Sequence, residues 1–132
     1  MVDYGLARRA TLTSLVAGTS TREDVCDAHP YLLRAARHHG EPTGRECPVC
    51  RRQRLVQVSY VYGDQLGPYA GRVKVAAELE VMAREHGEFR VYVVEVCSGC
   101  AWNHLIRSYV LGDGGDRGAL SRGAAGRQAV RR

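Results

Sequence analysis

The sequence CPVC at residues 47–50 has a counterpart, CSGC, at residues 97–100. Each stretch has two cysteines with two residues between them, and 46 residues separate the two pairs. Structural zinc prefers four thiolates supplied as two such pairs, because the two-residue spacing lets the backbone turn so that both sulfurs face one ion. The sequence therefore predicts a structural Zn²⁺ ion with four ligands, Cys47, Cys50, Cys97 and Cys100.

The residues between the two pairs explain their wide separation. Residues 54–62 and 88–96 are rich in β-branched and aromatic side chains, and their alternation predicts two strands. Residues 72–87 place apolar side chains at helical spacing and end at a glycine, which predicts a helix between the strands. If the two strands pair, the two cysteine pairs meet. A third strand is expected at residues 101–112, and a turn at residues 41–46 (EPTGRE).

The N-terminal third of the chain contains residues that typically begin and end helices. Residues 2–18 have apolar side chains near helical spacing and end at Gly18. The cluster TSTRED at residues 19–24 supplies capping residues followed by acids, as at the start of a helix. Pro30 fits the first turn of a further helix, and Gly40 fits the position after its end.

Together these patterns predict an α+β fold in three parts. A helical arm at residues 1–44 precedes a zinc-ribbon-like core at residues 45–111, with a small antiparallel sheet of about three strands and one inserted helix. Residues 112–132 are rich in glycine, alanine and arginine without periodicity, which predicts a disordered tail. The tail carries five arginines against two aspartates, whereas residues 1–111 carry 14 basic and 12 acidic side chains. The folded part is therefore nearly neutral.

Composition predicts a cytoplasmic protein. Of the 132 residues, 45% are hydrophobic and 25% are charged, and no apolar run approaches the roughly 20 residues that span a membrane. Thr11, Thr13 and Ser14 interrupt the N-terminal stretch that most resembles a signal peptide. The five cysteines are an odd number, which favours metal or redox chemistry over a disulfide framework in such a protein.

Three alternatives to the four-cysteine site stay open. A redox-active C-x-x-C stands at the start of a helix, whereas both pairs here precede strand patterns. A rival ligand set, Cys26, His29, Cys47 and Cys50, has acceptable spacing for zinc. The cysteines could also be buried without a ligand, and Cys26 itself is expected to be a small buried hydrophobic residue.

Two resemblances rest on these residues. CPVC and CSGC resemble the paired cysteines of zinc ribbons, which often carry glycine directly after the second cysteine, where this chain has Arg51 and Ala101. The strings VCDAHPYLLRAARHHGEP (25–42), CPVC and VVEVCSGCAWNHLIRSYVLG (93–112) resemble a family of small uncharacterised actinobacterial proteins, recorded as a domain of unknown function. The second resemblance implies a bacterial cytosolic protein, and it implies no activity.

The chemistry of these residues favours a binding module over an enzyme. A four-cysteine zinc site has no position for a catalytic water, and the glycine-containing segment 63–71 lacks the Lys-Ser/Thr of a phosphate-binding loop. Zinc ribbons present strands and loops to RNA, DNA or protein, so we expect such a partner in transcription or translation, and neither a membrane nor a small-molecule substrate. The side chains expected at the contact are Arg45, Arg51, Arg52 and Arg54. A zinc-linked thiol redox sensor is the alternative.

Overall fold

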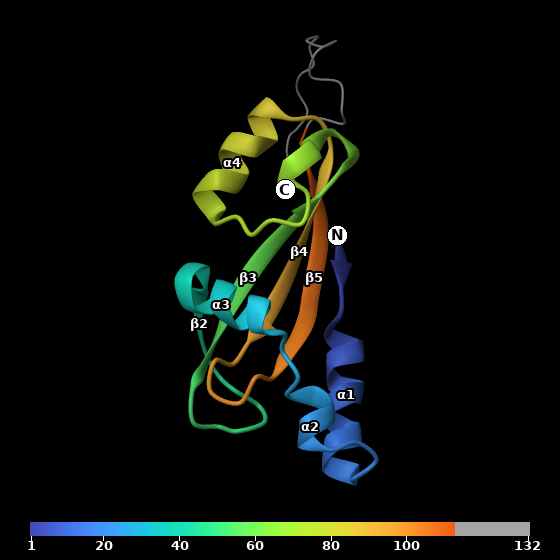
Figure 1. The fold of residues 1–132 in the computed structure, drawn as a ribbon. Coiled ribbons are helices and arrows are strands. Elements are labelled where there is room, and N and C mark those ends of the chain that lie inside the picture. Colours follow the sequence, from blue (N-terminus) through green and yellow to red (C-terminus); the bar gives the residue numbers. More distant parts are fainter. Residues whose placement is uncertain (113–132) are drawn as a thin grey trace. The chain divides into compact units, whose positions relative to one another are not determined.

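The computed structural model describes residues 1–112 and has an α+β fold with a small antiparallel sheet of five strands (Figure 1). The order of the strands in the sheet is β1-β5-β4-β3-β2. The strands are β1 (Val2–Asp3), β2 (Glu41–Glu46), β3 (Arg54–Tyr62), β4 (Phe89–Val96) and β5 (Asn103–Leu111). The helices are α1 (Gly5–Ala17), α2 (Arg22–Val25), α3 (Pro30–His39), the 3-10 helix η1 (Asp64–Tyr69) and α4 (Ala76–Glu85). From residue 113 onward, the predicted tail lies outside the described residues.

The first and third N-terminal helices end where the sequence predicts, and the second and third begin where it predicts, whereas α1 begins at Gly5 rather than at residue 2. α1 ends at Gly18, whose φ of 84° is a left-handed conformation that glycine adopts without strain. Thr21 caps α2, because its hydroxyl accepts the N–H of Asp24 while the Asp24 carboxylate accepts the N–H of Thr21. Pro30 occupies the first turn of α3, where its missing N–H costs nothing. The expected helices are therefore confirmed, except that residues 2–3 form the strand β1 and do not belong to the first helix.

β3, α4, β4 and β5 confirm the predicted strand, helix and two further strands, in that order. The prediction of about three strands is incomplete, because β1 and β2 add a strand at each edge of the sheet. The prediction of a turn at residues 41–46 is wrong, since β2 pairs antiparallel with β3 and places Pro42 opposite Val56. An edge strand tolerates a proline, and the pairing shifts register between Pro42 and Glu46, near Gly44 with its φ of 78°.

The described chain divides into two compact units, and β3, β4 and β5 contribute residues to both. The cysteine unit consists of residues 3–58 and 93–107, so it contains α1, α2, α3, β2 and both cysteine pairs. The α4 unit consists of residues 1–2, 59–92 and 108–112. The buried apolar side chains of the α4 unit include Val61, Leu66, Leu79, Met82, Phe89 and Val91. No helix of either unit, within residues 1–112, combines the length and apolar character needed to cross a membrane.

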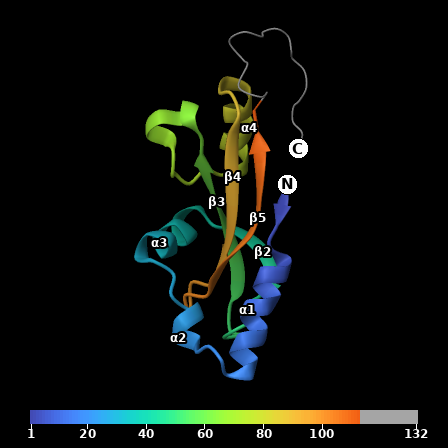
Figure 2. The ribbon, with the colours of Figure 1, turned by 90° about the vertical axis from the view of Figure 1, so that its right-hand side faces the viewer.

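A cluster of buried side chains in the cysteine unit surrounds the two cysteine pairs. Its members are Val25, Cys47, Leu55, Cys97 and Trp102. Leu12 and Leu15 pack against this cluster, although α1 has no fully buried residue. Figures 1 and 2 show that the segments before β3 and after β4 lie at the same end of the sheet, close to α2. The cysteine pairs are therefore part of the core at this end of the sheet.

Candidate metal centre

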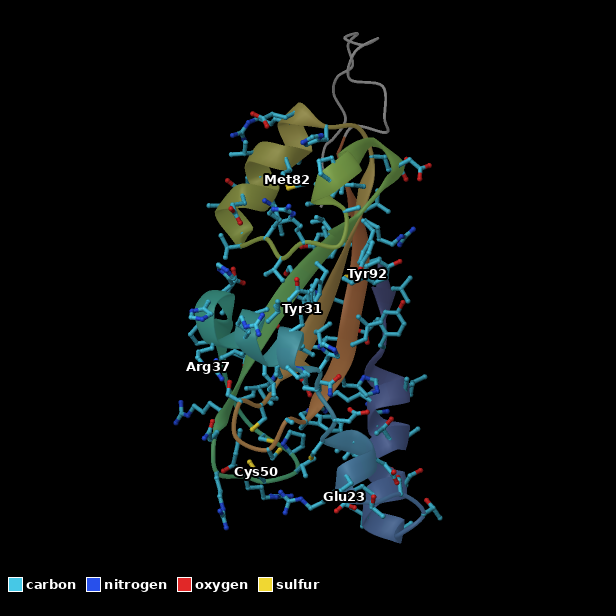
Figure 3. All side chains as sticks on the ribbon, viewed as in Figure 1. Glu23, Tyr31, Arg37, Cys50, Met82 and Tyr92 are labelled. Atoms are coloured by element: carbon cyan, nitrogen blue, oxygen red, sulfur yellow. The ribbon has the colours of Figure 1, made fainter. Side chains whose placement is uncertain are left out.

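The two cysteine pairs bring four sulfur atoms together. The Sγ atoms of Cys47, Cys50, Cys97 and Cys100 all lie within 4.8 Å of one another. Those of Cys47 and Cys100 are 3.7 Å apart, and those of Cys50 and Cys97 are 3.6 Å apart. Figure 3 shows the sulfur atoms gathered beside the labelled Cys50. Four sulfurs at about 2.3 Å from a zinc ion form a tetrahedron with edges of about 3.8 Å, so the arrangement fits one tetrahedral ion.

The two pairs form matching turns, which we call the first knuckle (residues 47–53) and the second knuckle (residues 97–102). In each knuckle, the first cysteine makes two backbone hydrogen bonds. Its N–H donates to a carbonyl at the end of the turn, and its carbonyl accepts the N–H of the residue after the second cysteine. With the N–H donor named first, the bonds are Cys47 to Gln53 (2.8 Å), Arg51 to Cys47 (3.1 Å), Cys97 to Trp102 (2.9 Å) and Ala101 to Cys97 (2.9 Å). Because β3 follows the first knuckle and its neighbour β4 precedes the second, the sheet brings both knuckles to one place.

The residue after the second cysteine has the same unusual backbone conformation in both knuckles. The φ angle is 57° at Arg51 and 74° at Ala101, and these are the two non-glycine residues with positive φ in the described chain. For residues with a side chain, this left-handed region costs roughly 1–2 kcal/mol. The chain thus lacks the glycine that zinc ribbons often carry here but keeps the turn that glycine favours.

Backbone N–H groups point at the sulfur atoms of the knuckles. The N–H groups of Cys50 and Cys100 each lie 3.5 Å from the sulfur of the first cysteine in their own knuckle. The N–H of Arg52 lies 3.4 Å from the Cys50 sulfur. This bond is the main reason that the pKa of Cys50 is lowered to about 7. Burial raises the pKa of Cys97 and of Cys100. A bound cation would offset this burial penalty, since it binds the deprotonated thiols.

A buried carboxylate lies on β4, next to the second knuckle. Glu95 is 1% exposed. It accepts hydrogen bonds from Nε of Arg8 at 2.7 Å, Nε1 of Trp102 at 2.8 Å and Nη2 of Arg45 at 3.4 Å. The two ion pairs link β4 to α1 and to β2. The sequence patterns do not predict this network, although an acid inside an apolar strand pattern is a signal of buried partners.

The four arginines predicted to contact a partner differ in their surroundings. The side chain of Arg45 is 56% exposed, but its guanidinium pairs with Glu95. Arg51, Arg52 and Arg54 are exposed. No carboxylate within residues 1–112 forms an ion pair with any of these three. The first knuckle and the start of β3 therefore present three positive charges that no carboxylate of residues 1–112 pairs with.

The rival ligand set does not come together. His29 is exposed, and its Nδ1 accepts the N–H of Tyr31 at 3.0 Å, which caps α3. Cys26 is half-buried and packs against the core cluster, so the expectation of a small buried hydrophobic residue is met only in part. The Sγ of Cys26 lies 3.6 Å from the Sγ of Cys100. The geometry favours the four-cysteine set and places a fifth sulfur at its edge.

Comparisons with other proteins give a family and no activity. The family model described as "Family of unknown function (DUF5318)" matches residues 1–125. Uncharacterised proteins of Mycobacterium bovis and Mycobacterium tuberculosis are 50% identical to this chain over 111 residues, which cover 84% of this chain and 81% of each relative. No solved structure matches the chain. The mycobacterial relatives confirm the resemblance to an actinobacterial family, and the chain belongs to the family of unknown function DUF5318.

Proposed function

We propose that this protein is a non-enzymatic binding module whose two knuckles are held together by one structural Zn²⁺ ion. The observation that carries the proposal is the near-tetrahedral spacing of the four cysteine sulfurs. Tetrahedral thiolate sites select zinc or iron–sulfur centres, and a site closed by four protein ligands has no position for a catalytic water. Both properties of the site favour a structural role for the ion.

Zinc would stabilise the part of the core that surrounds the knuckles. Cys47 and Cys97 are fully buried and belong to the same cluster as Leu55 and Trp102. In small metal sites of this kind, the free energy of metal binding contributes directly to the free energy of folding. The ion would thus cross-link two segments of the chain that are distant in the sequence.

The test of the metal proposal is elemental analysis of the purified protein. We expect one zinc ion per chain in the wild type and in Cys26→Ser, and none in Cys97→Ser, which lacks a buried ligand. Cys26→Ser is the matched control because it removes a sulfur from the same cluster but leaves the four-cysteine set intact. A wild type without metal, or a Cys97→Ser protein that keeps its zinc, would contradict the proposal.

For the partner, we propose nucleic acid bound at the first knuckle. The three unpaired arginines Arg51, Arg52 and Arg54 support this proposal. The distribution of charge supports it too, because the cysteine unit carries ten arginines against seven acidic side chains. The described part of the α4 unit carries four basic and five acidic side chains. Arginines of this kind bind phosphates, and their contribution to affinity falls as salt rises.

The test of the partner is the salt dependence of binding to a single-stranded RNA oligonucleotide. The logarithm of affinity falls as the logarithm of salt concentration rises, with a slope of roughly −0.7 for each phosphate contact on a single strand. If Arg52 and Arg54 each contact one phosphate, Arg52→Gln/Arg54→Gln should make this slope shallower by about 1.4. Arg72→Gln/Arg84→Gln is the control, since it removes equal charge from exposed positions of the α4 unit. If the salt slope changes equally in both double variants, or if the wild type does not bind the RNA, a protein partner is favoured. Zinc release at low peroxide would instead favour the thiol sensor.

A further inference from the structure

We propose that Cys26 is a reserve ligand of the metal site, whose thiolate can take the coordination position of Cys100. This inference rests on the proposed zinc site and adds a fifth sulfur to it. The Sγ atoms of Cys26 and Cys100 are 3.6 Å apart. That distance equals the separation of Cys50 and Cys97 across the site and is close to the 3.7 Å between Cys47 and Cys100. Cys26 is therefore as near to one ligand as the ligands are to one another.

The position of Cys26 is fixed by contacts on both sides of it in the sequence. Its own N–H donates to the carbonyl of Arg22 at 2.7 Å, which ends α2. The N–H of Ala28 donates to the carbonyl of Ala101 at 3.0 Å, so the chain after Cys26 is bound to the second knuckle. A side-chain bond reinforces this link, because the amide of Asn103 donates to the carboxylate of Asp27 at 3.0 Å. The segment after α2 thus carries its cysteine to the knuckle that contains Cys100.

The site is asymmetric in a way that singles out Cys100. Cys50 and Cys100 are equivalent in their knuckles, as each is the half-buried second cysteine of a pair with a sulfur of the other pair close by. Among the described residues, Cys100 alone has a sulfur from outside the four-cysteine set in contact with it. If Cys100 leaves the ion or is removed, Cys26 stands next to the vacant position. No such replacement is available for Cys50 within residues 1–112.

A simpler role for Cys26 makes the opposite prediction. A neutral Cys26 thiol can donate a hydrogen bond to the Cys100 sulfur and do nothing else. In that case the loss of Cys100 removes a ligand without replacement. The two roles therefore differ in how well the protein binds metal after Cys100 is changed.

The experiment is a titration with Co²⁺ in place of zinc, read by the absorption bands that report tetrahedral coordination and cobalt–thiolate bonds. We expect Cys100→Ala to weaken cobalt binding by less than about 10-fold and to keep a four-thiolate spectrum. The matched variant Cys50→Ala should weaken cobalt binding by more than about 100-fold. Loss of a residue that only hydrogen-bonds to a metal ligand already costs up to roughly 100-fold. Cys26→Ala should bind like the wild type, and the double variant Cys26→Ala/Cys100→Ala should lose binding as Cys50→Ala does.

Protection from alkylation gives a second readout at single residues. In the zinc-loaded wild type, a thiol reagent followed by mass spectrometry should modify Cys26, because it is half-buried and outside the ligand set. In zinc-loaded Cys100→Ala, Cys26 should be protected. Loss of metal in Cys100→Ala equal to that in Cys50→Ala, or continued alkylation of Cys26 in it, would overturn the inference and leave the zinc proposal standing. A wild type that binds neither cobalt nor zinc would overturn both.

Discussion

Replacing Arg51 and Ala101 by glycine should stabilise the protein. Both residues have a left-handed backbone, with φ of 57° and 74°. A residue with a side chain loses roughly 1–2 kcal/mol of stability in this conformation. Glycine removes that cost but loses about 0.5–1 kcal/mol through the greater freedom of its unfolded chain. Each substitution should therefore stabilise the folded protein by about 0.7 kcal/mol, and by at most roughly 1.5 kcal/mol.

The assay is urea denaturation of the zinc-loaded protein, with zinc in excess so that metal loss does not dominate the transition. Arg52→Gly is the control, since Arg52 has no positive φ and its replacement should cost about 0.5–1 kcal/mol instead. If Arg51→Gly and Ala101→Gly lose as much stability as the control, the left-handed conformation does not strain the backbone at these two residues.

Three further predictions concern the surroundings of the knuckles. Glu95→Gln should destabilise the protein by roughly 1–3 kcal/mol in urea denaturation, because a buried amide cannot accept hydrogen bonds from three donors as the carboxylate does. The control is Arg45→Gln, which removes a half-exposed partner of Glu95 and should cost less than about 1 kcal/mol. Gly40→Ala should cost roughly 1–3 kcal/mol in the same assay, since the new methyl would meet the Ala36 carbonyl oxygen and lie 2.8 Å from Cγ2 of Val56. Removal of zinc by a chelator should reduce the helical circular dichroism signal, because α1 and α2 pack on the cluster that contains the ligands. An unchanged signal would show that these two helices pack on the cluster without the metal.

Local signals in the sequence are enough to predict most of the helices and central strands. Pro30 and Gly18 fix helix ends through backbone properties of a single residue, and the capping of α2 involves residues three apart. The side-chain alternation that predicts β3 and β4 likewise depends only on residues close together in the sequence. The spacing within each cysteine pair is also local, so the four sulfurs can be grouped without knowledge of their distances.

The features that the sequence does not reveal depend on contacts between distant residues. β2 has the proline and glycine of a turn, and it forms a strand because β3 offers it a partner. Arg8 and Glu95 are 87 residues apart, and no periodic pattern connects them. The position of Cys26 depends on the bond from Ala28 to Ala101, whereas its residue type alone suggests an ordinary buried position.

The size of the cluster around the knuckles explains why a metal would be needed at this end of the sheet. Besides its two cysteines, the cluster has three buried apolar side chains, Val25, Leu55 and Trp102. Full burial of Val25 and Leu55 contributes about 1.5–3 kcal/mol each, and Trp102 contributes about 4–6 kcal/mol because its side chain is larger, so the three together supply roughly 7–12 kcal/mol. A structural zinc ion contributes about 10–16 kcal/mol in small zinc-binding peptides. The ion would therefore stabilise this region at least about as much as the three side chains do, and α1, which has no fully buried residue of its own, would depend on it through Leu12 and Leu15.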